Sequence, residues 1–559
     1  MSCPRKHFVA VALWLAASVG FAYDITTDTL WSGDHRVTES VVIQYGATLR
    51  IDAGTTVQLP ADAYIHITRT SMAKGRILAE GTSARPIIFT RTGHKSGSGY
   101  WGKVSLVESA RENRFTYCQF WYGNGNATVP DCSGKGVITS NASRFLAQDC
   151  GFYWHLGDSA YIENGSTATL RRCYFHAWNS GPPWEFGTCS EEGVTGCYSH
   201  VEEDSCIFAY REGRYDASDI EGTGFHVWVH DSIFLGSNLD DGCDFDNSDG
   251  MVERCVFYNY NGSVPGWATR CGGVTMNDAG TRIVRNNIFI SCRQGIISKG
   301  DTYPNITNCT FFNCFNDIAA YEYGEPSPKQ VGHPTVRNCL MWATTSQTLV
   351  LGNDSGTGEP CSVDIDYCLV DSTPTLHRSD PRVKCGSHIF KADPLFANPA
   401  TTMTANPDFH LRSKAGRWDP KANGGAGAWV VDAVHSPAID AGDPASSYSL
   451  EPSPNGNRVN LGAYGNTAQA SKSIPLYSLQ IRVTPTTAGT VTKTPARTTY
   501  FYRETVGLRA VPAPDYRFVR WEGSVTGTKD TLSVVMDANK SVTAVFAYSR
   551  TAVSRWAKY

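Results

Sequence analysis

The chain has 559 residues and a formal net charge of −4, and its basic residues are scattered along the sequence. This length predicts two or more domains, and the charge argues against a nucleic-acid partner. Aromatic residues make up 11% of the chain, charged residues only 18%, and there are 52 glycines. This composition suits a β-rich extracellular protein better than a helical one.

Residues 1–22 are predicted to be a signal peptide. Arg5 and Lys6 form a basic start, residues 8–17 form an apolar core, and Gly20, Phe21 and Ala22 make a small-x-small cleavage site. The apolar run is shorter than the ~20 residues that a membrane span needs, and no later stretch is long enough to span a membrane. We therefore expect a secreted or cell-surface protein, extracellular or periplasmic, that is monomeric.

Residues 46–90 are predicted to form the first of a series of short strands. Apolar and polar residues alternate in the segments 46–59, 65–67, 75–82 and 86–90, and glycines stand at the bends. Alternation with a period of two residues is typical of strands that bury one face.

A motif recurs from residue 118 onwards, in which a cysteine is followed two positions later by an aromatic or aliphatic residue. Successive copies are 22 to 33 residues apart, and the smallest steps are those required by a stacked coil of three short strands. Each coil would add one rung of about 4.8 Å. The copies begin at Cys118, Cys150, Cys173, Cys206, Cys255, Cys309, Cys339 and Cys368, with Ser232 and Asn287 in two gaps.

These eight cysteines are predicted to form an interior ladder rather than disulfides. Cysteine is a small apolar filler that suits tight stacking, although 18 cysteines in an exported chain would otherwise indicate a disulfide framework. Outside the ladder, Cys189 with Cys197 and Cys361 with Cys385 are the disulfide candidates.

Residues 238–250 contain five aspartates. If this stretch is a strand, Phe245 points inward and Asp244 and Asp246 share one solvent face. Such closely packed like charges repel unless a cation lies among them, although aspartates also favour solvated turns. Calcium prefers oxygen ligands, and the predicted set is Asp240, Asp241, Asp244, Asp246 and, from the preceding coil, Glu221.

Aligning the coils on the ladder predicts an outward column of Asp246, Asn277, Lys299 and Tyr321. Asp246 and Lys299 would lie about 10 Å apart. Lys299 and Tyr321 are the predicted catalytic residues, although Lys299 would also suit a surface lysine beside Asp301. The predicted substrate-binding residues are Asn277, Glu322, Arg282 and His226. His226 and His230 flank Trp228 on one strand face. This face is expected either to line a sugar groove or to be exposed to solvent.

A family resemblance is carried by the opening and closing segments of the predicted coil region. They are residues 46–57 at the start and residues 393–396, 408–411, 436–442 and 460–464 at the end. Over roughly residues 25–470 the chain resembles secreted bacterial right-handed parallel β-helix proteins of the pectate-lyase-like superfamily. The resemblance implies an all-β fold with a right-handed parallel β-helix at residues 23–470. It is specific for fold and much less so for activity.

Residues 471–478 are predicted to be a linker, and residues 479–548 a small C-terminal β-domain followed by a tail at 549–559. Through Gly489, Trp521 and the segment 542–546, among others, this domain resembles the divergent internalin-type B-repeat of bacterial surface proteins. Trp521 and Phe518 are expected in its core.

Residues 240–244 are similar to the calcium box of the β-helical pectate lyases in polysaccharide lyase family nine, which pair this box with a lysine base. The resemblance implies β-elimination on a uronic-acid polysaccharide. Calcium would neutralise the substrate carboxylate, Lys299 would remove the C5 proton, and Tyr321 would donate to the leaving oxygen. Lys299 lies about two coils beyond the box, further than that family suggests, so Arg282 or Arg285 is the alternative base.

Two other functions fit the sequence. A non-catalytic β-helical adhesin or carbohydrate-binding protein would agree with the B-repeat-like domain. A glycoside hydrolase would use paired carboxylates, such as Asp241 with Asp244 or Glu221. The lyase requires a base beside the aspartates, which a binding protein does not.

Overall fold

The structure is a computed structural model that describes residues 22–68, 75–109, 111–176, 194–209, 216–222, 226–236, 241–262, 271–277, 280, 282–323, 330–352, 361–371 and 376–549. Residues 1–21, and with them the predicted signal peptide, lie outside this part of the chain, as do Asp240 and Cys189. Among the described residues, no helix is long and apolar enough to cross a membrane.

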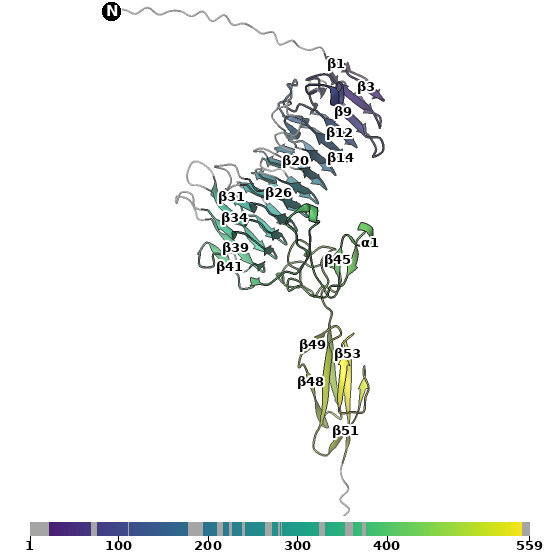
Figure 1. The fold of residues 1–559 in the computed structure, drawn as a ribbon, viewed down its shortest axis with the longest axis vertical. Helices are drawn as coiled ribbons and strands as arrows, with labels where there is room; N and C mark the ends of the chain where they lie inside the picture. The colour runs from purple at the N-terminus through teal and green to yellow at the C-terminus, as the bar shows by residue number, and fades with distance from the viewer. Residues whose placement is uncertain are drawn as a thin grey trace, which may run out of the picture. The chain divides into compact units, whose positions relative to one another are not determined.

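Three parallel sheets, here called sheets A, B and C, run through the described residues from 22 to 391, each with 14 strands. Nearly every coil places one strand in each sheet, so strands three apart in the sequence are neighbours (Figure 1). This is the predicted all-β fold with a parallel β-helix.

Sheet A has the order β1 (Ala22–Ile25), β4 (Ser40–Ile43), β7 (Ile65–Ile67), β10 (Val104–Val107), β13 (Gly136–Asn141), β16 (Asp158–Glu163), β19 (Val194–Cys197), β22 (Ser218–Glu221), β25 (Cys243–Asp246), β28 (Val274–Asn277), β31 (Gln294–Lys299), β35 (Gln330–Val331), β34 (Asn316–Tyr323) and β38 (Gln347–Leu351).

Sheet B has the order β2 (Thr29–Trp31), β5 (Thr48–Ile51), β8 (Arg76–Glu80), β11 (Asn113–Thr116), β14 (Arg144–Gln148), β17 (Thr167–Arg171), β20 (His200–Asp204), β23 (His226–His230), β26 (Asp249–Glu253), β29 (Arg282–Arg285), β32 (Asn305–Thr307), β36 (Thr335–Arg337), β39 (Val363–Asp366) and β41 (Val383–Cys385).

Sheet C has the order β3 (Asp34–Arg36), β6 (Thr56–Leu59), β9 (Ile87–Arg91), β12 (Cys118–Trp121), β15 (Gly151–Tyr153), β18 (Tyr174–His176), β21 (Ile207–Ala209), β24 (Ile233–Leu235), β27 (Val256–Tyr258), β30 (Ile288–Ile290), β33 (Thr310–Phe312), β37 (Leu340–Trp342), β40 (Leu369–Val370) and β42 (Phe390–Lys391). A short 3₁₀-helix, η1 (His94–Ser96), follows β9.

The corner between sheets B and C is a single residue in the left-handed conformation. It stands directly before each ladder position, with φ between 47° and 57° in ten coils. Asparagine occupies it in three coils and tolerates this conformation better than most residues. The ten residues are Tyr117, Asp149, Arg172, Ser205, Asp231, Arg254, Asn286, Asn308, Asn338 and Tyr367.

A column of phenylalanine rings fills the interior behind sheet C. Successive rings from Phe89 to Phe289 stack with centroids 4.5 to 5.3 Å apart and planes within 17° of parallel. The spacing matches the distance between hydrogen-bonded strands, so each ring fixes the register of the next coil. The rings belong to Phe89, Phe120, Phe152, Phe175, Phe208, Phe234, Phe257 and Phe289.

The eight ladder cysteines are buried free thiols beside this column, as predicted. Several of the thiols donate to a carbonyl of the preceding coil, as Cys150 Sγ does to Phe115 O at 3.2 Å. Cys197, Cys361 and Cys385 are also free thiols. The predicted Cys361–Cys385 disulfide is therefore wrong, and Cys197 instead donates to a neighbouring carboxylate.

The two polar substitutes in the ladder are satisfied by backbone groups. Asn287 Oδ1 accepts from the Cys255 N–H at 2.8 Å, and Asn287 Nδ2 donates to Val252 O at 2.8 Å. The Ser232 hydroxyl accepts from the Cys206 N–H at 2.9 Å. Both side chains thus avoid the cost of burying polar groups without partners.

The chain forms two compact units, one of residues 1–305, 313–334 and 345–363 and the other of residues 306–312, 335–344 and 364–559. The parallel coils end at Lys391, so the predicted β-helix region to residue 470 includes a less regular segment. This segment contains β43 (Phe396–Asn398), η2 (Met403–Ala405), β44 (Asp408–Leu411), β45 (Arg417–Asp419), α1 (Ala422–Gly425) and β46 (Ala428–Val430).

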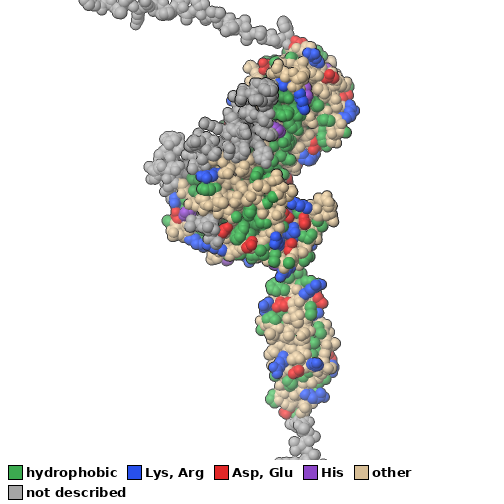
Figure 2. All heavy atoms as spheres, in the orientation of Figure 1, with side chains coloured by type: hydrophobic (Ala, Val, Ile, Leu, Met, Phe, Trp, Pro, Cys, Tyr) green, Lys and Arg blue, Asp and Glu red, His purple; other side chains and the backbone are tan. Residues whose placement is uncertain are grey.

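The C-terminal β-domain is formed by a four-stranded and a three-stranded sheet. Trp521 is 1% exposed and packs with Tyr500, Met536 and Phe546 in the core, while Phe518 lies partly buried against it. On the face in Figure 2, acidic and basic side chains are interspersed. The strands are β47 (Leu476–Thr484), β48 (Gly489–Thr494), β49 (Thr499–Phe501), β50 (Thr505–Pro512), β51 (Tyr516–Gly523), β52 (Thr531–Val535) and β53 (Lys540–Tyr548).

Truncating one ring of the interior column should destabilise the coils. Phe208 is 1% exposed and stacks on Phe175 and Phe234. We expect Phe208→Ala to lower the free energy of unfolding by about 3–5 kcal/mol, because it leaves a cavity that the fixed rungs cannot close. Urea unfolding measures the change. Ile207→Ala, at the 36%-exposed neighbouring position, should cost much less, and equal losses would contradict the interior role.

A buried acid in the interior should make stability depend on pH. Burial raises the pKa of Glu203 to about 8, and a hydrogen bond from Ser218 only partly opposes this. The folded protein therefore holds a proton that the unfolded chain releases near the ordinary value of 4.5. This stability is fully present below about pH 4.5 and is lost as the pH rises through about 8.

Glu203→Gln keeps a hydrogen-bonding oxygen for Ser218 and removes the charge. We expect the decline in melting temperature between pH 5 and pH 8 to become shallower in this variant. Part of the slope should remain, because burial also raises the pKa of Glu451 to about 7. An unchanged slope would show that Glu203 is not the titrating group.

Candidate functional site

The acidic stretch forms a strand on sheet A. In β25 the side chains of Cys243 and Phe245 are buried in the interior, while Asp244 and Asp246 are half-buried on the outer face. The predicted alternation is therefore present. The strand pairing places Asp244 opposite Asp219 and Asp246 opposite Glu221 on the preceding rung.

Four carboxylates thus form a two-by-two array on two adjacent rungs. Burial, followed by the negative charges of Asp244, Asp246, Glu221 and Asp158, raises the pKa of Asp219 to about 8. Like charges this close cannot all ionise at neutral pH without compensation. A bound cation would supply that compensation.

The next rung adds two neutral oxygen ligands. Thr275 lies opposite Asp244 and Asn277 opposite Asp246, and both side chains are almost fully buried. In the part of the chain that the structure describes, the buried oxygen atoms Thr275 Oγ1, Asn277 Oδ1 and Asp246 Oδ1 have no hydrogen-bond partner. Buried acceptors are normally satisfied, so their chemistry fits a hard, oxygen-preferring cation such as calcium.

The described carboxylates of sheet A do not form a compact ligand cluster by themselves. Among the described residues, only Asp204, His230 and Asp231 bring three acidic or histidine ligand atoms within 4.8 Å of one another. Asp246, Asn277 and Thr275 are the side chains on sheet A that would hold a cation, and calcium readily accepts water or substrate oxygens as further ligands.

On sheet B, neighbouring cationic groups compensate the negative charges of the carboxylates. Burial raises the pKa of Asp204, but hydrogen bonds from Ser205 and Arg171 outweigh it, and the pKa lies below its ordinary value. Asp231 is held low in the same way by Arg254 and His230. The trio around His230 is thus neutralised by arginines, which makes it a structural ion-pair network rather than a metal site.

Lys299 and Tyr321 follow on the predicted column. Lys299 lies opposite Tyr321 on the outer face, and both are half-buried. Met276 pairs with Ser298, which places Asn277 and Lys299 next to each other in register. The Tyr321 hydroxyl donates to Gln294 Oε1 at 3.1 Å. The structure therefore brings Glu221, Asp246, Asn277, Lys299 and Tyr321 onto five successive rungs.

Other residues predicted for the site lie elsewhere. Asp241 is buried in the corner before β25, where its Oδ1 accepts the Gly272 N–H at 2.5 Å, which does not suit the paired carboxylate of a hydrolase. His226 is on sheet B and stacks on His200. Glu322 follows Tyr321 in β34 and pairs with Val331 of β35.

Arg282 does not reach the outer face. It pairs with Gly250 on the inward-facing set of sheet B and is 2% exposed. Its guanidinium Nη2 donates to the Asn277 carbonyl at 3.4 Å. Arg282 therefore supports the corner after β28 from inside, where it cannot bind a polymer on the surface.

One member of the array, Asp219, and one neighbour, Cys197, were not predicted. Asp219 repeats the Asp-x-acid pattern of Asp244 and Asp246 one coil earlier, and this repeat was the signal that could have identified it. Cys197 lies opposite Glu221 and donates to its Oε1 at 3.1 Å. Burial, with the Glu221 and Asp219 charges, raises the pKa of this thiol to about 12, so it stays protonated beside the array.

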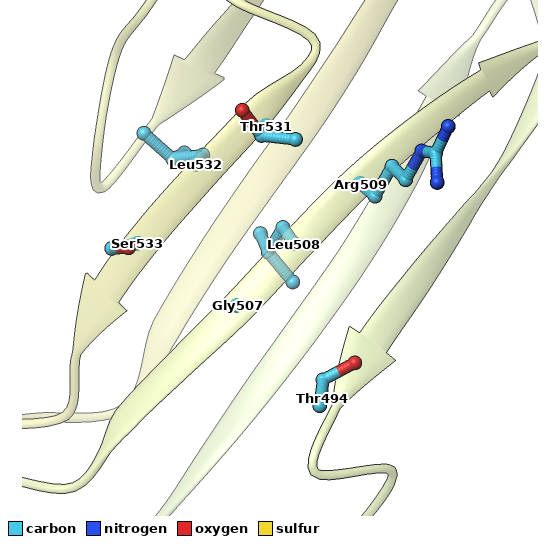
Figure 3. A pocket seen from close by; sticks show the side chains of 7 residues that line it. All are labelled: Thr494, Gly507, Leu508, Arg509, Thr531, Leu532 and Ser533. Atoms are coloured by element: carbon cyan, nitrogen blue, oxygen red, sulfur yellow. The ribbon is translucent and has the colours of Figure 1, made fainter.

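A separate pocket lies on the three-stranded sheet of the C-terminal domain (Figure 3). Its volume is about 270 Å³, and Gly507 leaves the space open between Thr494 and Ser533. Arg509 is the one charged side chain among the residues that line it. The pocket therefore lacks the paired titratable groups that acid–base chemistry requires.

Three family models match parts of the chain. Residues 24–141 match the pectate-lyase like beta helix domain, and residues 126–356 match the right handed beta helix region. Residues 479–550 match the divergent InlB B-repeat domain. No curated protein matches the chain in sequence.

Several solved structures are similar to the chain at low identity. The PL6 family alginate lyase AlyGC is 11% identical with a TM-score of 0.42, and the match covers 82% of this chain but only 58% of that one. A mannuronic acid specific polysaccharide family 6 lyase from human gut microbiota is 12% identical with a TM-score of 0.28, covering 61% and 81%. A mutant tailspike protein of E. coli bacteriophage HK620, in complex with a pentasaccharide, is 11% identical with a TM-score of 0.27, covering 66% and 72%.

Proposed function

We propose that this protein, a pectate-lyase-like right-handed parallel β-helix protein with a divergent InlB B-repeat domain, is a secreted, calcium-dependent polysaccharide lyase. Its substrate would be a uronic-acid-containing polysaccharide cleaved by β-elimination. The observation that carries the proposal is the register of sheet A, where an acidic array, a buried amide, a lysine and a tyrosine occupy successive rungs.

The acidic end of the column would hold the cation. Glu221 and Asp246 would supply carboxylate oxygens, and Asn277 and Thr275 would supply neutral oxygens that lack hydrogen-bond partners among the described residues. When bound, calcium supplies positive charge that neutralises the substrate carboxylate and so acidifies the neighbouring C5 proton. The negative array alone would repel a uronate chain, so binding of an acidic polymer requires the cation.

The other end of the column would handle the protons. Lys299 lies two rungs, or about 10 Å, from Asp246. The neutral amine of Lys299 removes the C5 proton. The C4=C5 double bond forms as the C4–O bond breaks, and the Tyr321 hydroxyl delivers a proton to the leaving oxygen. Tyr321 must first release Gln294, to which it now donates, and the departing sugar hydroxyl can take that place.

Calcium binding can be tested without activity. At a calcium concentration of about 100 times Kd, we expect the free energy of unfolding to rise by about 2.7 kcal/mol, measured against EDTA. Asp246→Asn should raise the melting temperature of the calcium-free protein, because it relieves repulsion, and should also weaken the response to calcium. Asn277→Ala should weaken the response as well.

Glu202→Gln is the matched control for these variants, since it removes a carboxylate on sheet B that faces Arg171. Its calcium response should equal that of the wild type. If calcium neither binds by calorimetry nor shifts the wild-type melting temperature, the array is not a calcium site.

Activity is tested by incubating the purified chain with pectate, alginate and glycosaminoglycans, with calcium or with EDTA. The ultraviolet absorbance of the unsaturated uronate product reports cleavage. Lys299→Ala should lower the rate by about 100-fold or more, because it removes the general base, without lowering the melting temperature. Lys384→Ala, at an exposed lysine paired with Asp364, should retain activity. No product with any uronate polymer would refute the lyase.

The B-repeat domain favours a second candidate function, a non-catalytic β-helical adhesin or carbohydrate-binding protein. Residues 479–550 match a repeat named after InlB, and a binding protein needs no base beside its cation. Calcium-dependent retention of pectate or alginate without any unsaturated product would support this candidate over the lyase.

A further inference from the structure

A tryptophan on the outer face of sheet B is held in a fixed orientation. Trp228 is 37% exposed, and its ring centroid lies 4.0 Å from that of His230, which is 7% exposed. Trp228 Nε1 donates to Glu253 Oε1 at 3.1 Å. One face of the indole is thus covered by the imidazole while the indole itself stays accessible to solvent. An aromatic surface that needs no reordering binds ligands at a lower entropic cost.

An apolar strip continues from this tryptophan along the coils. Trp228 pairs in register with Met251, which pairs with Ile283, and the last two side chains are half-buried. Three rungs span about 10 Å, a length comparable to a short oligosaccharide. Polar rows border the strip, with His226 on one side and Arg285 on the other.

On the Arg285 side of the strip, each nearby arginine is paired with a carboxylate. Arg171 pairs with Asp204 at 2.7 Å, Arg254 pairs with Asp231 at 2.8 Å, and Arg285 pairs with Glu253 at 2.6 Å. These arginines are already engaged by carboxylates, so none is available to select an anionic ligand. The same groups still present N–H donors and carboxylate acceptors to neighbouring hydroxyls.

We propose that this strip is a second carbohydrate-binding site, specific for neutral saccharides. The C–H face of a pyranose ring would pack on the indole of Trp228. Its hydroxyls would bond with Glu202, which pairs with Trp228 on the preceding rung, and with Arg285 at the border. Aromatic side chains with fixed polar neighbours suit ligands that are apolar on one face and polar at the edge. The site lies on a different sheet from the acidic array, and the proposal does not rest on lyase activity.

The test is affinity electrophoresis of the purified chain through gels that contain xylan, hydroxyethylcellulose or galactomannan. Pectate and alginate gels serve as acidic comparisons, and EDTA is present throughout to remove any cation from sheet A. We expect retardation by at least one neutral polymer. Trp228→Ala should weaken it by about tenfold or more, a loss of about 1.4 kcal/mol, whereas Trp228→Phe, which keeps an aromatic face, should retain most of it.

Trp429→Ala is the matched control, because Trp429 is also 37% exposed but lies outside sheet B. It should migrate like the wild type, and circular dichroism should show that all variants are folded. No retardation by any neutral polymer would overturn the proposal. Retardation that Trp228→Ala leaves intact, or that occurs only with the acidic polymers, would overturn it too.

Discussion

The stacking of one coil on the next at a fixed spacing is the constraint on which this structure depends. The phenylalanine column repeats at 4.5 to 5.3 Å, which is the spacing that the backbone hydrogen bonds between strands also impose. Because the two repeats agree, a coil cannot slip relative to its neighbour without losing both ring stacking and hydrogen bonds. Residues from different coils are therefore brought into columns on the outer faces by the packing of the interior.

The columns of side chains on the outer faces of sheets A and B differ in how their charges are balanced. On sheet B, arginines pair with carboxylates on neighbouring rungs, so that their charges neutralise one another within the protein. On sheet A, acids stand opposite acids, and the pKa of Asp219 rises to about 8. Such an arrangement costs stability unless something outside the chain compensates it, and for this reason the face with unbalanced charge is the better candidate for a cation-dependent function.

The fold and the main column were predictable, because the cysteine and phenylalanine repeat marks the interior, and counting back from it gives the register of Asp246, Asn277 and Lys299. Tyr321 was placed by matching the pattern of residues 317–322 to that of residues 294–299, because a long insertion separates it from Cys339. The prediction was less accurate where the A–B corner varies in length. Asp219 stands 13 residues before Ser232, whereas Asp244 stands 11 before Cys255, so Asp219 was missed and Glu221 was placed near Asp244. Arg282 stands five residues before Asn287, just as the interior residue Gly250 stands five before Cys255, so the ladder count marked it as interior and this signal was overlooked.

The short corner between sheets B and C limits where the chain can change in length. From β11 to β40 this corner never exceeds two residues, whereas the connections on either side of sheet A range from a few residues to more than a dozen. Chain length can therefore change along both borders of sheet A while the interior stack stays intact. Insertions and deletions at these borders can reshape the surface around sheet A without shifting the column of Asp246, Asn277, Lys299 and Tyr321.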